Sequence, residues 1–263
     1  ISMFIIIFLF ASVKLQAQKT TEILWDNYGV PHIYASNEEE MYYAFGWAQM
    51  HNHADLLLEL YGQARGRAAE YWGEDYLELD KLVHLFNLPD SASAHYKKQS
   101  GADKKNLDAF VNGINAYAKA HPYKINDKLK KVLPIAATDV LAHAEKVIYF
   151  DFLAADDLGE TQRLLAPGSN AYAIAPSKSA SKHAMLVTNP HLPWGNLYLF
   201  FEAQLTAPGF NAYGVSLIGM PTLNIAFNEY LGWTHTVNTI DASDRYELTL
   251  QDGGYLLDGK TVP

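Results

Sequence analysis

The chain has 263 residues and a formal net charge of −9, from 20 Lys and Arg against 29 Asp and Glu. Hydrophobic residues make up 49% of it, a globular composition that excludes a disordered tail, a collagen-like repeat and a coiled coil. An acidic chain without a Lys/Arg block offers no track for phosphates, so we expect no nucleic-acid partner. The absence of cysteine from the sequence excludes disulfides, thiolate metal sites and a Cys nucleophile within these residues.

The first predicted element is a signal peptide at residues 1–17. Met3–Phe10 reads MFIIIFLF, and small residues follow up to Ala17. Such a run is typical of a secretory signal cleaved near Ala17 or Gln18, and it is too short to span a bilayer. The usual positive segment before the run is missing, and a buried β-strand is the alternative interpretation. We expect a periplasmic or secreted protein that is free of the membrane once the signal is removed.

Two strands and a long helix are predicted next. Residues 22–36 alternate around a turn at Gly29-Val30-Pro31, which is typical of a strand, a turn and a second strand. Asn37 then offers a capping side chain, with Glu40 three residues later as in a capping box. We therefore expect a helix that starts at Asn37 and runs toward Leu60.

Further helices are predicted before Pro167-Gly168, where the sequence changes from helical to strand-rich. The apolar stripe of residues 103–120 predicts the clearest helix, and Thr138-Asp139 predicts the capped start of another that continues to about Ala154. After this point Pro and Gly turns separate short β-rich runs, namely AYAIA, AMLVT, LYLFFEAQL, YGVSLIGM and LNIAF. A hairpin is predicted at 252–254, and its return strand meets no closing element, so we expect the chain to be cut short.

Two motifs are candidates for catalysis. Gly168-Ser169-Asn170 lies at the boundary between the helical and the strand-rich part, where glycine permits unusual backbone angles, although these residues alone favour an ordinary loop. His191 lies between Pro190 and Pro193, which stiffen its loop. A neutral imidazole held in this way can accept a proton near pH 7, so His191 is a candidate catalytic residue.

Two other motifs suggest metal binding at first sight. Asp241-Ala242-Ser243-Asp244 offers oxygen ligands for Ca²⁺, but its spacing is not that of an EF-hand loop and favours a solvated acidic turn. His51-Asn52-His53-Ala54-Asp55 lies in the predicted helix, where His51 and Asp55 share a face and His53 does not. Because no HExxH pattern is present, we interpret this motif as structural.

Taken together, these segments resemble the penicillin acylase family of N-terminal nucleophile hydrolases, and most closely its acyl-homoserine-lactone and aculeacin A acylases. The resemblance rests on WDNYGVPHIYA, AFGWAQMHNHADLLLELYGQARGRAAEYWG, GSNAYAIAPSKSASKHAMLVTNPHLPW and PGFNAYGVSLIGMPTLNIAFNEYLGWTHTVN, which follow one another over most of the chain. It implies an α+β fold, the Ntn-hydrolase four-layer αββα sandwich, which we expect to be incomplete here because the chain is truncated.

The resemblance also implies self-cleavage between Gly168 and Ser169. Residues 18–168 would then form a mostly helical small subunit with a short spacer, and residues 169–263 the first part of a strand-rich large subunit. Ser169 would be the nucleophile, with its own α-amine, whose unperturbed pKa is about 8, as the base. No cofactor would be needed for catalysis, and the protein partner would be the chain's own cleaved subunit.

Further roles follow from the same resemblance. One oxyanion donor would be the backbone N–H at Val237, and the other, an Asn side chain, would lie beyond Pro263. His191 would orient the serine and its amine. Leu192 and Trp194 are the substrate-binding candidates, with Leu192 forming part of the wall of an apolar acyl pocket.

A structural Ca²⁺ remains an open alternative to the solvated acidic turn. Asp241, Ser243 and Asp244 match positions that bind calcium in many family members. The resemblance implies a further ligand from the small subunit, for which the candidates are Asp156, Asp157 and Glu160.

The expected function is therefore that of an exported, self-processing amide hydrolase. Its small-molecule substrate would be an acyl amide, such as an acyl-homoserine lactone or a lipopeptide. A β-lactam side-chain acylase and an inactive secreted binding homologue are the alternatives.

Overall fold

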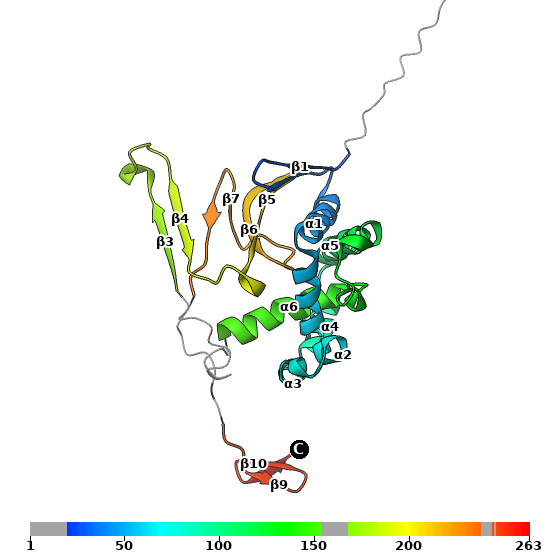
Figure 1. Ribbon diagram of the computed structural model, residues 1–263. Coiled ribbons are helices and arrows are strands. Elements are labelled where there is room, and N and C mark those ends of the chain that lie inside the picture. The colour runs from blue at the N-terminus through cyan, green and yellow to red at the C-terminus, as the bar shows by residue number, and fades with distance from the viewer. Residues whose placement is uncertain (1–19, 154–167, 238–243, 245) are drawn as a thin grey trace, which may run out of the picture.

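The computed structural model describes residues 20–153, 168–237, 244 and 246–263. Helices gather on one side of a sheet, and a two-stranded ribbon lies on the sheet's other side (Figure 1). None of the helices in this part of the chain is long and apolar enough to cross a membrane. The predicted signal peptide and the expected spacer before Gly168 lie outside the described residues.

The α-helices of the described residues all belong to the N-terminal part of the chain. They are α1 (Glu38–Ala64), α2 (Ala68–Trp72), α3 (Leu77–Leu85), α4 (Leu88–Lys98), α5 (Gly101–Ala120) and α6 (Ala137–Val147), which continues into a π-helical turn, η4 (Ile148–Leu153). Single 3₁₀ turns are found at η1 (Glu74–Tyr76), η2 (Pro122–Lys124), η3 (Lys130–Val132), η5 (Pro176–Lys178) and η6 (Asn196–Tyr198).

The main sheet takes strands from both parts of the chain. Its order is β1 (Glu22–Trp25), β2 (Pro31–Tyr34), β5 (Phe200–Ala207), β6 (Phe210–Leu217), β7 (Ile225–Phe227) and β8 (Gly232–Trp233). β2 and β5 are parallel, and the other neighbours are antiparallel. β3 (Ser169–Ile174) pairs with β4 (Met185–Pro190), and β9 (Leu250–Gln251), β10 (Gly254–Leu257) and β11 (Lys260–Val262) form a small separate sheet.

The core lies where α1 packs between α5 and the sheet. Phe45 of α1 is fully buried, with its ring 5.8 Å from that of Phe110 on α5 and 5.9 Å from that of Phe201 on β5. Two glycines allow α1 and α5 to approach closely, because a methyl group at Gly46 or Gly113 would collide with a backbone carbonyl of the opposite helix. The helical part and β5 therefore share one continuous core.

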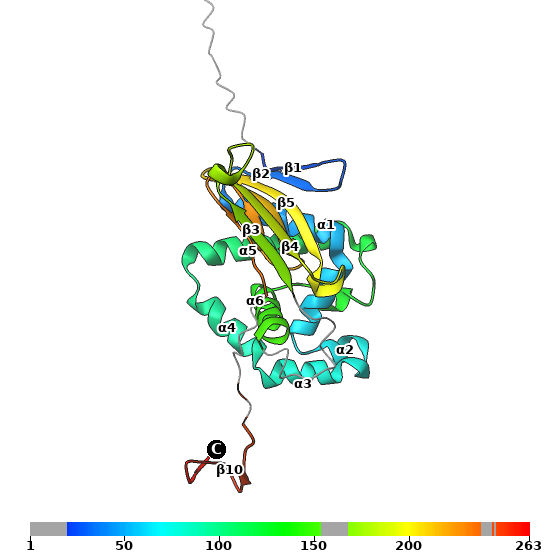
Figure 2. The ribbon, with the colours of Figure 1, turned by 90° about the vertical axis from the view of Figure 1, so that its left-hand side faces the viewer.

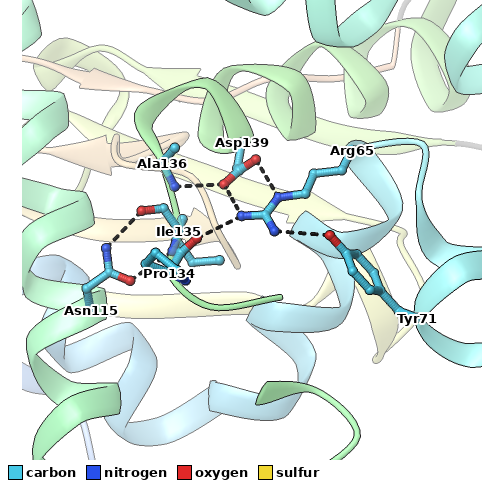
Figure 3. A network of polar contacts seen from close by, with 7 residues as sticks. All are labelled: Arg65, Tyr71, Asn115, Pro134, Ile135, Ala136 and Asp139. Atoms are coloured by element: carbon cyan, nitrogen blue, oxygen red, sulfur yellow. Dashed lines mark hydrogen bonds and ion pairs between the residues drawn. The ribbon is translucent and has the colours of Figure 1, made fainter. Parts of the chain in front are cut away.

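A partly buried ion pair fixes the start of α6 (Figure 3). Arg65, just after α1, donates two hydrogen bonds to Asp139, at 2.7 and 2.6 Å, and one to the carbonyl oxygen of Pro134 at 2.9 Å. Asp139 also accepts a hydrogen bond from the backbone N–H of Ala136, and the Asn115 side chain bonds both backbone groups of Ile135. These contacts attach the start of α6 to α1 and α5.

Most of the elements predicted from sequence are confirmed. Asn37 caps α1 by accepting a hydrogen bond from the Glu40 N–H at 2.9 Å, and the predicted helix over 103–120 is α5. The five β-rich runs form β3 to β7, and the hairpin at 252–254 joins β9 to β10.

Some details of the prediction are wrong. The expected cap at Thr138 is wrong, because Ala136 occupies the N-cap position of α6 and Asp139 completes the start of the helix. The return strand after 252–254 is divided into β10 and β11 by a turn in which Asp258 and Gly259 both have positive φ angles. Helices α2, α3 and α4 lie within residues 68–98, where none was predicted from sequence.

Candidate active site

The β3–β4 ribbon brings Ser169 and His191 together. Ser169 is the first residue of β3 and pairs with Pro190, the last residue of β4, so His191 follows directly across from the Gly168-Ser169 junction. The end of the ribbon at which β3 begins lies close to α6 in both views (Figures 1 and 2). The pairing thus places the predicted nucleophile and the predicted histidine at one end of a short hairpin.

Two groups donate hydrogen bonds to the carbonyl oxygen of Gly168. The Ser169 hydroxyl donates to it at 2.5 Å, and the backbone N–H of His191 donates to it at 3.0 Å. Both donors draw electron density from the carbonyl carbon, and the His191 N–H is placed to stabilise negative charge on its oxygen. This peptide bond is the one at which the family resemblance implies self-cleavage.

The His191 ring packs against the same junction. A Cβ atom at Gly168 would lie 3.4 Å from Nδ1 of His191, which is ordinary van der Waals contact, so the imidazole lies beside the junction. On its other side, Nε2 lies 3.1 Å from Nδ2 of Asn170. With the amide nitrogen as donor, Nε2 is the acceptor, and the neutral ring carries its proton on Nδ1.

Asn170 is a site residue to which the sequence analysis assigned no role. It appeared there only as the third residue of the junction, and its contact with His191 depends on the register Asn170↔Asn189 between β3 and β4. Among the described residues no direct hydrogen bond joins the Ser169 hydroxyl to the His191 ring. The two residues meet through the Gly168 carbonyl instead.

The two substrate-binding candidates differ in their surroundings. Leu192 is half-buried, whereas the Trp194 side chain is 99% exposed. A cleft of about 890 Å³ lies between the ribbon and the main sheet, lined among others by Ile174, Met185 and Phe227, but neither candidate lines it. The acyl pocket at Leu192 and Trp194 stays a prediction.

The remaining candidates are not brought to Ser169 by the described contacts. Val237 is half-buried in irregular chain after β8. Asp244 is exposed, while Asp241 and Ser243, as well as the possible calcium ligands Asp156, Asp157 and Glu160, lie outside the described residues. Within the described ranges no group of three or more His, Asp or Glu side chains is arranged to hold a metal ion.

The His51–Asp55 motif lies in α1, as predicted, and its polar atoms bind neighbouring groups. Nδ1 of His51 lies 2.8 Å from the Asn52 side-chain oxygen, and the Asp55 carboxylate accepts a hydrogen bond from the backbone N–H of Asn126. His53 has non-helical backbone angles and marks a kink in the helix. These contacts are consistent with a structural role.

Residues 20–263 match the family model described as Penicillin amidase. The chain belongs to the penicillin amidase family. The match begins with β1 and includes the Gly168-Ser169 junction, His191 and Val237, so it covers the helical and the strand-rich part together.

Several curated relatives of this penicillin amidase family member are acyl-homoserine lactone acylases. It is 29% identical to acyl-homoserine lactone acylase PvdQ of Pseudomonas putida over 96% of the chain and 38% of that protein. It is 30% identical to PvdQ of Pseudomonas savastanoi pv. phaseolicola over 92% of the chain and 37% of that protein, and 24% identical to acyl-homoserine lactone acylase QuiP of Pseudomonas aeruginosa over 89% and 35%. The chain thus spans less than two-fifths of these relatives.

A solved structure, thermostable penicillin G acylase from Alcaligenes faecalis in tetragonal form, is matched with a TM-score of 0.45 and 21% identity over 53% of this chain and 79% of that one. The family assignment rests on the family model, and the mixed helix and strand content agrees with the predicted α+β class.

Proposed function

We propose that the chain supplies the nucleophile of an exported acylase, an amide hydrolase that removes a linear acyl chain from the amine of an acyl-homoserine lactone or a similar lipopeptide. The observation that carries the proposal is the Gly168 carbonyl, which accepts hydrogen bonds from the Ser169 hydroxyl and the His191 N–H. Three curated relatives that are named acyl-homoserine lactone acylases support the choice of substrate.

The first step is self-cleavage before Ser169. The Ser169 oxygen attacks the carbonyl carbon of Gly168, and the His191 N–H holds the negative charge that develops on the oxygen. The C–N bond then breaks, the nitrogen of Ser169 takes up the proton that the hydroxyl has lost, and Gly168 is left as an ester on the Ser169 oxygen. Water hydrolyses this ester to give a Gly168 carboxylate and a Ser169 hydroxyl with a free α-amine.

The same hydroxyl then attacks the substrate. The α-amine of Ser169, with an unperturbed pKa of about 8, accepts the hydroxyl proton as the hydroxyl adds to the amide carbonyl, and it returns that proton to the departing amine. Water releases the acyl group from the resulting ester. In this scheme the N–H of Val237 is an oxyanion donor, and His191, held by Asn170, keeps the serine oriented.

The wider assembly is part of the proposal. The products of the cut remain together as a heterodimer of a helical small subunit and a strand-rich large subunit, within the four-layer αββα sandwich of the family. Catalysis uses no cofactor. A structural Ca²⁺ would be held by Asp241, Ser243 and Asp244, whose carboxylate and carbonyl oxygens suit that ion.

Mass spectrometry of the full-length protein tests the cleavage. A chain that begins Ser169-Asn170-Ala171 is expected in the native protein, and Ser169→Ala is expected to remain uncut. A protein that stayed uncut and still hydrolysed amides would rule out Ser169 as an N-terminal nucleophile.

A substrate panel tests the specificity. Acyl-homoserine lactones with a range of acyl lengths should be hydrolysed in preference to penicillins G and V. The opposite order would favour a β-lactam side-chain acylase, and binding without turnover of any amide would indicate a non-catalytic homologue.

A further inference from the structure

The turn between β6 and β7 is bound by buried side chains from the helical part of the chain. Residues 217–220 form a tight turn in which Gly219 has a φ of +86°. The residues Leu217, Ile218 and Met220 of this turn are all buried. The groups that contact this turn come from α1 and α6, which lie 75 to 171 residues away in the sequence.

Three side chains bind successive backbone groups of the turn. His143 donates from Nε2 to the Ile218 carbonyl at 3.0 Å, and the Tyr61 hydroxyl donates to the Gly219 carbonyl at 2.8 Å. The Gln49 amide makes two bonds, accepting from the Gly219 N–H and donating to the Met220 carbonyl, both at 2.9 Å. We call these three side chains and residues 217–220 the turn clamp.

All three side chains of the turn clamp have an exposed fraction of 0%. Burial, together with the positive charge of Lys146, lowers the pKa of His143 to about 3, so the ring is neutral and donates through Nε2 alone. Each of these hydrogen bonds joins two groups that water cannot reach. The Met220 carbonyl also accepts a hydrogen bond from the Ser216 hydroxyl at 3.0 Å. Loss of a clamp side chain nevertheless leaves the Ile218 carbonyl, the Gly219 carbonyl or the Gly219 N–H buried and unsatisfied, which is far more costly than the loss of a surface hydrogen bond.

The close packing of His143 and Tyr61 against Gly219 leaves no room for a side chain at this position. A Cβ atom at Gly219 would lie 2.9 Å from Cδ2 of His143 and 3.2 Å from Cε1 of Tyr61, and the positive φ angle also favours glycine. The turn clamp thus depends on shape as well as on hydrogen bonding. The helical part supplies the three side chains and the strand-rich part supplies the turn, so neither part forms these hydrogen bonds alone.

The turn clamp connects the two sides of the proposed cleavage site. Gln49, Tyr61 and His143 precede Ser169, whereas residues 217–220 follow it. The parallel pair β2–β5 and the ring contact between Phe45 and Phe201 cross the same boundary. To the strand pairing and apolar packing the three polar side chains add directional hydrogen bonds between the two parts.

We propose that the turn clamp holds the two chains together once the peptide bond before Ser169 is broken, so that the partner recognised by the turn 217–220 is the chain's own cleaved helical fragment. This inference rests on the proposed self-cleavage. It assigns to Gln49, Tyr61 and His143 a role in subunit association that leaves them outside the chemistry at Ser169.

The test separates association from self-cleavage by making the cut with an added protease. Full-length Ser169→Ala protein receives a site-specific protease sequence within residues 154–167 and is cut after purification. The clamp variant carries Gln49→Leu and Tyr61→Phe. The matched control carries Gln63→Leu and Tyr96→Phe, which remove a buried glutamine and a half-buried tyrosine hydroxyl whose partners, Glu59 and Asp108, lie in the same helical part.

Before the cut, all three proteins should show the same circular dichroism, because the covalent link keeps the two parts at a high effective concentration. After the cut, the parent and the control should elute as one complex. The dissociation constant of the clamp variant should rise about a hundredfold, roughly tenfold for each side chain that no longer satisfies a buried group. Equal dissociation constants for all three would overturn the proposal.

A variant with one change covers the case in which the double clamp variant does not fold. Tyr61→Phe removes a single hydroxyl and keeps the ring, so the fold should persist with about a tenfold rise in the dissociation constant. No rise in that variant would refute the clamp. If the native protein stays uncut while the protease-cut clamp variants dissociate, the proposed function fails and the clamp stands.

Discussion

The helical part of the chain and the β3–β4 ribbon differ in how firmly each is held. Phe45 and the side chains of the turn clamp are fully buried and surrounded by other groups. On the ribbon, Tyr172, Met185 and Val187 are 59%, 50% and 41% exposed. The region with the most buried contacts carries none of the proposed chemistry, while Ser169 and His191 lie on or next to strands with exposed faces.

This difference separates the sources of stability and of activity. Free energy of unfolding comes mainly from buried apolar area and satisfied buried polar groups, which lie in the helical part and the main sheet. A hairpin with exposed faces contributes little to it. Substitutions in the two regions should therefore have opposite effects, changing stability with little direct effect on the site in one and activity with little effect on stability in the other.

The largest expected effect is that of Ser169→Ala. Without the hydroxyl, neither self-cleavage nor amide hydrolysis has a nucleophile, so both should be abolished. The midpoint of thermal unfolding should equal that of another uncleaved variant of this chain. The reason is that the only described side-chain contact of Ser169 is with the adjacent Gly168 carbonyl. Mass spectrometry, an amide hydrolysis assay and a thermal melt measure the three quantities.

A core substitution should show the reverse pattern. Phe45→Ala removes a ring packed against Phe110 and Phe201, and it should lower the free energy of unfolding by about 3–5 kcal/mol. Val187→Ala on the ribbon is the matched change, with an expected cost of about 0.5 kcal/mol because the side chain is exposed. Denaturant titration of both variants provides the comparison, and equal costs would show that the ribbon is as tightly packed as the core.

His191→Ala tests whether the ribbon contributes to catalysis. Loss of a positioned imidazole should lower kcat of the cleaved enzyme by roughly a hundredfold. The backbone N–H that binds the Gly168 carbonyl is retained in this variant, so self-cleavage should continue. A drop confined to KM would make His191 a binding residue, and a lowered melting temperature with full activity would mean that it only braces the loop.

A pH titration of stability tests the helical part. The pKa of His143 is about 3 when folded and about 6.5 when unfolded, so the unfolded state binds the proton more readily. Stability is therefore greatest above pH 6.5 and falls as the pH is lowered toward 3, by up to about 1.4 kcal/mol per unit from this residue. His143→Gln keeps a donor for the Ile218 carbonyl but does not titrate, so its stability should fall less steeply over that range.

The sequence predicts local features of this molecule better than contacts between distant residues. The capping side chain of Asn37 and the apolar stripe of α5 are determined within a few residues, and both predictions are confirmed. The helices at 68–98 have no capping side chain, and α4 follows a left-handed Asn87, although Pro89 and Asp90 in its first turn are local helix signals that the prediction did not use. Their positions depend on tertiary contacts that no short pattern records.

The site shows the same limit. Ser169 and His191 could be selected from their motifs, yet the role of the His191 N–H depends on the register that places Ser169 opposite Pro190. The turn clamp is less predictable still, because Gln49, Tyr61 and His143 each look like ordinary helix residues in the sequence. Only the fold shows that they meet one glycine turn.

Substitution of Asn170 should have the smallest effect on activity, and it tests most directly whether the ribbon positions His191. Its amide nitrogen lies 3.1 Å from Nε2 of His191 on an exposed face, so Asn170→Ala should lower kcat by about three- to tenfold, the range expected for one exposed hydrogen bond. KM and the melting temperature should stay unchanged, since the side chain has no other described partner.

Asn170→Asp extends the test to pH. A carboxylate in this place favours the protonated ring, so the acidic limb of the kcat/KM profile should move to higher pH, which a residue that merely supported the hairpin would not cause. If Asn170→Ala kept full kcat and Asn170→Asp kept the parent profile, the contact with His191 would have no part in catalysis. His191 would then be oriented by the Gly168 backbone alone, and the ribbon would need only its strand register to build the site.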